Sequence, residues 1–184
     1  MAERSYEFGR VDLVQADAIG VPGQRRFRLR ARAGGQYALV WVEREQIQAL
    51  GLALEQLLTQ VQVQYHQRPV KADPGGPLDD FPMTPTVEFT AGRIGLGYDG
   101  EHDLAVLELT DIEQNLAGQE EEAERAAEAV TLVIRFSRGQ AAALRDQCEA
   151  TLAAGRPRCH LCGAPMAPDG SHFCIRANGH AHGA

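Results

Sequence analysis

The last thirty residues of the chain, 155–184, concentrate side chains that bind metal ions. They hold three of the four cysteines and four of the six histidines: Cys159, Cys162, Cys174, His160, His172, His180 and His182. Thiolate sulfur and imidazole nitrogen are the ligands that zinc prefers in proteins. This stretch therefore predicts a small metal site near the end of the chain.

The spacing of these residues selects four of them. Cys159 and Cys162 form a CxxC pair followed by Gly163, which permits the turn that directs amide groups toward sulfur in a zinc knuckle. The Pro-Asp-Gly sequence at 168–170 predicts a second turn, after which the HxC motif at 172–174 returns toward the first pair. The predicted ligand set is three thiolates and one imidazole, from Cys159, Cys162, His172 and Cys174.

Two features of this prediction stay open at the sequence level. His172 is favoured as the fourth ligand, but His180 and His182 follow an Asn-Gly turn and can reach back, whereas His160 is expected to point away from the metal. A redox CxxC is expected where a helix begins after a strand, and here proline and glycine surround it. Four protein ligands close the coordination shell, which favours structural Zn2+. With three thiolates and a water instead, an enzyme would return to consideration.

The chain before this site predicts two similar halves. In the first, residues 6–19 predict one strand or two, 25–33 and 36–42 predict strands, and apolar spacings of three and four predict a helix over 44–64. Five prolines in residues 67–85 predict an irregular connector. In the second half, residues 86–96, 103–109 and 130–136 predict strands, and 111–129 predict an acidic loop or a short exposed helix. Ser137, with Gln140 three residues on, predicts a capped helix ending near Gly155.

The shared order of elements predicts an α+β fold. Gln46 matches Gln140, and Ala49-Leu50 matches Ala143-Leu144, so we expect duplicated βββα units with an antiparallel sheet, followed by a C-terminal zinc knuckle. The alternative is two unrelated antiparallel stretches. The expected boundaries are 1–66 for the first half, 67–85 for the connector, 86–155 for the second half and 156–184 for the zinc-binding segment.

Other residues whose side chains could bind a ligand or react have simpler explanations. The arginine ridge, defined as Arg26, Arg28, Arg30 and Arg32 on one face of a strand, can bind phosphate or an acidic partner, form a solvated face, or pair with the glutamates of residues 120–124. Cys148 lies on the apolar stripe of its helix and is expected to be a buried small side chain. The glycines of residues 92–97 lead into a turn and strand, and His102 is expected at the surface.

Composition narrows the class of protein. A net charge of −7 disfavours non-specific nucleic-acid binding. Neither an apolar run of about 20 residues nor a secretory signal is visible, so a cytoplasmic protein without a membrane partner is expected. In that compartment a CxxC pair binds metal more often than it forms a disulfide.

The terminal motif, with the start at residues 16–20 and the sequence RPRCHLCG at 156–163, resembles the DUF3090 family. This uncharacterised bacterial family is also described as a repeat family, and the resemblance spans most of the chain. Ile175 stands where the family pattern usually has proline. The resemblance supports the metal motif and implies no known activity.

We therefore expect a zinc-stabilised, non-enzymatic binding or adaptor protein whose partner is another protein. One alternative is an enzyme, or an enzyme subunit, with a pocket between the two halves. Another is a nucleic-acid binder that uses the knuckle and the arginine ridge. The sequence predicts no catalytic residue and leaves the oligomeric state open.

Overall fold

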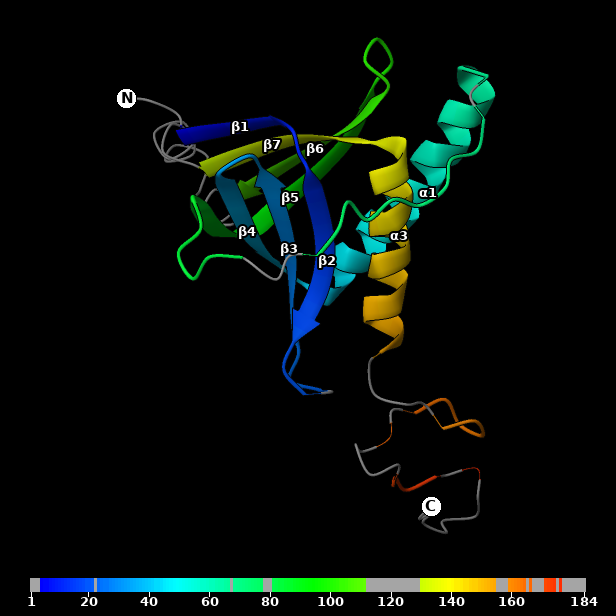
Figure 1. The fold of residues 1–184 in the computed structure, drawn as a ribbon. Helices are drawn as coiled ribbons and strands as arrows, with labels where there is room; N and C mark the ends of the chain where they lie inside the picture. Colours follow the sequence, from blue (N-terminus) through cyan, green and yellow to red (C-terminus); the bar gives the residue numbers. More distant parts are fainter. Residues whose placement is uncertain are drawn as a thin grey trace, which may run out of the picture.

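The computed structural model describes residues 4–21, 23–66, 68–77, 81–111, 130–154, 159–164, 166, 171–174 and 176, and it has an α+β architecture (Figure 1). The strands are β1 (Arg4–Arg10), β2 (Leu13–Ile19), β3 (Arg26–Ala33), β4 (Gln36–Val42), β5 (Val87–Asp99), β6 (Leu104–Asp111) and β7 (Val130–Ser137). The helices are α1 (Arg44–Gln64) and α3 (Arg138–Ala153). Residues 6–19 thus form two strands, and β5 extends three residues beyond its predicted end.

The seven strands form one sheet in the order β1-β7-β6-β5-β4-β3-β2. Neighbouring strands within each half are antiparallel, as expected, but β1 pairs with β7 and β4 pairs with β5 in parallel. The predicted antiparallel sheet is therefore wrong, and the sheet is mixed. Both parallel pairs join strands of different halves. Strands β4 and β5 are able to pair in parallel because α1 and the connector lie between them in the chain.

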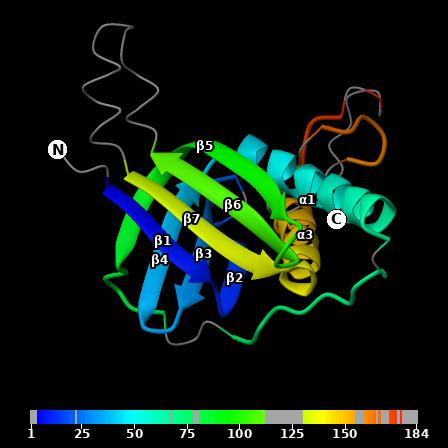
Figure 2. The same ribbon diagram turned by 90° about the horizontal axis from the view of Figure 1, so that it is seen from above.

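The two edges of this sheet meet at one short link between β1 and β2. The amide of Val11 donates to the carbonyl of Arg135 in β7, and the amide of Asp12 donates to the carbonyl of Arg32 in β3, both at 2.8 Å. Strand β5 also changes its pairing partner along its length: residues 87–90 pair with β4, and residues from Ala91 onward pair with β6. The strands therefore curve around a common interior (Figure 2).

The interior of this curved sheet is filled by the apolar face of every strand and of both helices. Strand β3 buries Phe27, Leu29 and Ala31 while its arginines face outward, as period-two alternation requires. Helix α1 buries Ile47 and Leu54 completely. The two helices pack against each other, α1 contacting β5 and α3 contacting β2 (Figure 1).

The third residue of each helix is a glutamine whose side chain makes hydrogen bonds through both its oxygen and its nitrogen. The side-chain oxygen of Gln46 accepts from the amide of Glu43 at 2.8 Å, and that of Gln140 accepts from the amide of Ser137 at 2.9 Å. The side-chain nitrogen of Gln46 donates to the carbonyl of Ala91 in β5, and that of Gln140 donates to the carbonyl of Asp12. Ala91 is where the pairing of β5 passes from β4 to β6, and Asp12 lies in the link between β1 and β2. Both hydrogen bonds therefore join a helix start to a place where the sheet pairing changes. The capping box predicted for the second helix is confirmed.

The connector is irregular over its described residues, as its prolines predict. Gly75 has φ +73°, and a Cβ at this position would lie 2.7 Å from the carbonyl oxygen of Asp12, so the connector crosses close to the sheet link. The acidic stretch predicted at 111–129 lies outside the described residues after Asp111, as does the predicted helix end at Gly155. None of the described helices is long and apolar enough to span a membrane.

Candidate metal centre

The first described residues after α3, from Cys159 to Ala164, form a tight turn that carries two of the predicted ligands. The amide of Gly163 donates to the carbonyl of Cys159 at 2.8 Å, and the amide of Cys159 donates to the carbonyl of Ala164 at 2.9 Å. Gly163 has φ +72°, the left-handed conformation that glycine adopts most easily. The amide of Leu161 points at the Cys159 sulfur at 3.4 Å. This is the local geometry that the CxxCG pattern predicts.

Amide groups around the first thiol change its protonation. Hydrogen bonds from the backbone amides of Cys162 and Leu161 lower the pKa of Cys159 below that of an ordinary thiol. Thiolate rather than thiol binds metals, so these amides favour the ligating form.

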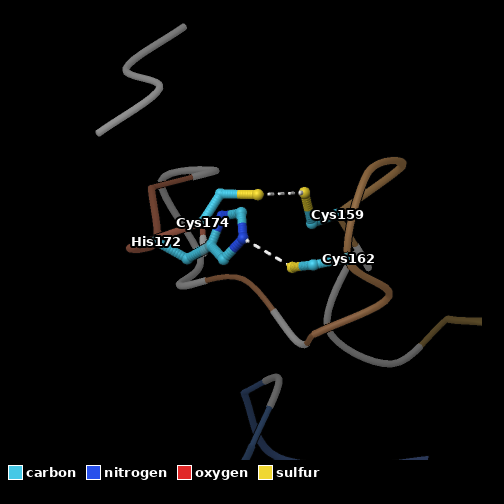
Figure 3. A group of neighbouring side chains, drawn as sticks. All are labelled: Cys159, Cys162, His172 and Cys174. Carbon is cyan, nitrogen blue, oxygen red and sulfur yellow. Dashed lines mark hydrogen bonds between the residues drawn. The ribbon is translucent and has the colours of Figure 1, made fainter. Parts of the chain in front are cut away.

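The second pair of predicted ligands lies against the first (Figure 3). The sulfur of Cys174 is 3.8 Å from that of Cys159, and Nε2 of His172 is 3.2 Å from the sulfur of Cys162. All four ligand atoms lie within 4.8 Å of one another. The tertiary structure thus gathers the four residues that spacing selected.

The dimensions of this cluster fit a single tetrahedral ion. Zinc–sulfur bonds of about 2.3 Å place two sulfurs roughly 3.8 Å apart around a tetrahedral centre. Cys159 and Cys174 are buried, and Nδ1 of His172 is buried without a hydrogen-bond partner among the described residues. The His172 ring turns its other nitrogen, Nε2, toward the Cys162 sulfur, so Nε2 is the atom that could bind the same ion. The four side chains are therefore able to hold a metal ion.

Comparison with known proteins then places the chain. A family model described as a protein of unknown function (DUF3090) matches residues 6–174, which include both halves and the four clustered residues. The chain belongs to the DUF3090 family. No curated protein and no solved structure matches it.

The remaining metal-binding candidates of this DUF3090 protein lie elsewhere. His160 is exposed, whereas His180 and His182 lie outside the described residues. Cys148 is fully buried in α3 as part of the apolar core, as its helical position predicts. Burial raises the pKa of the Cys148 thiol to about 12, which disfavours its thiolate.

The arginine ridge of the DUF3090 protein is bonded within the molecule. Asp17 on β2 lies directly opposite Arg28 on β3, accepts from its Nε at 2.6 Å, and also binds Arg30. The guanidinium of Arg26 stacks over the Trp41 ring at 3.9 Å. Glutamates of residues 120–124, an alternative partner at the sequence level, lie outside the described residues. The sequence alone did not identify Asp17 as the partner of these arginines, because cross-strand partners depend on the register of β2 against β3.

A second polar cluster of the DUF3090 protein was missed by sequence reasoning. Asp103 accepts two hydrogen bonds from the guanidinium of Arg138, at 2.7 and 3.1 Å, and one from the hydroxyl of Tyr98. Burial raises the pKa of Tyr98 to about 12, with the hydrogen bond to Asp103 adding to this rise. These contacts fasten the β5–β6 turn to the start of α3. His102 is exposed in this turn and pairs with Asp99.

Proposed function

We propose that Cys159, Cys162, His172 and Cys174 bind one structural zinc ion, and that the protein is a non-enzymatic, zinc-stabilised binding or adaptor protein. The observation that carries this proposal is the convergence of three thiolates and one imidazole within 4.8 Å. Such a donor set suits zinc, and four protein ligands complete its preferred tetrahedral shell. A complete shell favours structure over catalysis, because it leaves no position for substrate or water.

The apolar side chains around the cluster support a role in binding another protein. The ligands Cys159 and Cys174 are buried, but Phe173 is 69 % exposed and Leu161 is 37 % exposed. Both lie next to ligands in the sequence, so a bound ion would fix their positions. Large apolar side chains held outward are typical of interaction sites. Arg176, which donates to the carbonyl of Leu161 at 3.0 Å, adds a positive charge beside them.

The bonding of the arginine ridge disfavours the nucleic-acid alternative. Arg28 and Arg30 already share Asp17, so contact with a phosphate would have to replace an existing ion pair. The net charge of −7 acts in the same direction. The ridge is better explained as a feature that fastens β2 to β3.

We further propose that the two halves are duplicated βββα units. The support is that Gln46 and Gln140, matched in the sequence, make corresponding bonds to the sheet. The order β2, β3, β4 and α1 in the first half also matches β5, β6, β7 and α3 in the second, whereas β1 is an additional strand of the first half. The boundaries expected from the sequence stay a prediction.

The metal site is tested by the change Cys174→Ser. We expect purified protein to contain one equivalent of zinc by elemental analysis and the variant to lose it, because three ligands no longer close the shell. Cys148→Ala is the matched control: it also removes a buried thiol, yet it should keep the zinc. Full zinc retention by Cys174→Ser would overturn the ligand set.

The binding role is tested by affinity purification from the native host with full-length protein and with the Phe173→Ser variant. We expect a specific partner to be lost with Phe173→Ser while the zinc content is unchanged. Met83→Ser, which changes a fully exposed apolar side chain away from the cluster, should retain the partner. Equal recovery with both variants would contradict the proposed surface.

A further inference from the structure

Helices α1 and α3 border a solvent-facing groove of about 600 Å³ that the metal site does not use. The helices meet at Gly51 and Cys148, where a Cβ on Gly51 would lie only 3.2 Å from the Cβ of Cys148. The missing side chain allows the helices to approach closely at this point, and both residues line the groove. On α1 the groove runs from Gln48 to Glu55, which is two turns, or about 10 Å at 1.5 Å per residue.

The groove combines apolar walls with an acidic rim. Leu52 on α1 is 60 % exposed, and Leu152 on α3 is partly buried on the opposite wall. An exposed leucine within a groove gains free energy when a partner covers it. The rim carries three carboxylates and one guanidinium, from Glu55, Asp146, Glu149 and Arg145.

The charges of the rim are unbalanced. Arg145 binds Glu55 at 2.7 Å and Asp146 at 2.7 Å, so its guanidinium is already shared between two carboxylates. Glu149 has no ion-pair partner within the described part of the chain. A cationic partner would therefore find an attractive potential here, in keeping with the acidic balance of the whole chain.

We infer that this groove binds a short amphipathic helix of a partner protein, with its apolar side chains between α1 and α3 and its lysines or arginines on the acidic rim. Two turns of groove accommodate side chains spaced i, i+3 or i+4, and i+7 on one helix face. A second copy of this chain is disfavoured as the occupant, because its own rim would bring carboxylate against carboxylate. The groove is formed by the helices of the body, so this partner is additional to any that binds at the zinc site.

The test uses a synthetic peptide of about 18 residues, long enough to form helix, with leucines on one face and lysines on the other. Its binding to the full chain is followed by fluorescence anisotropy and by NMR shift mapping. The change Leu52→Gln should weaken binding by about tenfold, because it removes one buried leucine contact. The control is Val63→Gln, on the same helix and 73 % exposed but outside the groove, which should bind like the unchanged protein.

Charge and metal dependence complete the experiment. A peptide with glutamates in place of the lysines should bind far more weakly, and Glu149→Gln should reduce the salt dependence of lysine-peptide binding. Chelation of the metal should leave binding unchanged, so this result is independent of the proposed zinc site. Equal weakening by Leu52→Gln and Val63→Gln, or equal binding of both peptides, would overturn the inference. Sedimentation showing a dimer that Leu52→Gln dissociates would also overturn it, by assigning the groove to a second copy.

Discussion

At the scale of a single residue, Asp103 combines an uncommon backbone conformation with hydrogen bonds from two other side chains. It has φ 56°, a left-handed conformation that only glycine, asparagine and aspartate adopt readily. Hydrogen bonds from Arg138 hold its pKa below the ordinary value, and the hydroxyl of Tyr98 contributes in the same direction. Because the folded-state pKa is lowered, the carboxylate contributes stability above about pH 4 that is lost as the pH falls through the folded-state value.

The change Asp103→Asn isolates this charge, because asparagine tolerates the same backbone conformation. We expect it to lower the free energy of unfolding at pH 7 by roughly 0.5–1 kcal/mol, as befits a partly exposed ion pair. The difference from the unchanged protein should shrink toward pH 3, measured by urea unfolding at both values. Glu101→Gln, which changes an exposed carboxylate in the same turn, is the control. A difference that stayed constant with pH would show that the charge of Asp103 is not responsible.

The helix starts illustrate how elements are joined at a larger scale. Gln46 and Gln140 each cap a helix and reach a carbonyl where a strand changes partner. Gln140 is only 7 % exposed, and it also contacts the carbonyl of Val11 at 3.3 Å. A buried amide with several backbone partners is costly to remove, since every abandoned group loses its hydrogen bond.

We expect Gln140→Ala to lower the free energy of unfolding by about 1–3 kcal/mol. Gln46→Ala should cost less, because Gln46 is more exposed and satisfies a single sheet carbonyl. Chemical unfolding of the two variants side by side measures both values. If Gln140→Ala lowered the free energy of unfolding by less than Gln46→Ala, burial of the glutamine side chain would not determine the size of the loss.

At the scale of the whole molecule, we expect the body and the metal segment to be stabilised separately. The main apolar core extends from Phe8 to Cys148, with Leu152 packed against it, and it includes none of the described residues in 159–176. In the metal segment Leu161 and Phe173 are exposed, so metal binding would supply its folding free energy. Loss of the ion should therefore unfold the segment alone.

Truncation after Ala154 tests this separation. We expect the shortened chain to unfold cooperatively, with a free energy of unfolding within about 1 kcal/mol of the full-length value, because its core is intact. Chelation of the full-length protein should abolish protection of amides in residues 159–176 and leave those of the sheet protected, as measured by hydrogen exchange. If truncation or chelation removed the cooperative transition, the metal would stabilise the body as well.

The sequence by itself determined features that depend on neighbours along the chain. Alternating arginines identified β3, spacings of three and four gave α1 its correct bounds, and the CxxCG and HxC motifs selected four residues that gather within 4.8 Å. These signals are local. Side-chain direction repeats every two residues in a strand and every 3.6 in a helix, and each ligand pair of a zinc knuckle lies within a few residues of sequence.

Only the tertiary structure decided which distant segments pair. It placed β1 beside β7 and β4 beside β5 in parallel, where an antiparallel sheet was expected. It also placed Asp17 against the arginine ridge, which disfavours the ridge as a phosphate-binding surface. It brought Gly51 against Cys148, beside the groove between α1 and α3. Periodicity specifies the face that a residue occupies, whereas its partner across the sheet or between helices depends on register and packing of the whole chain.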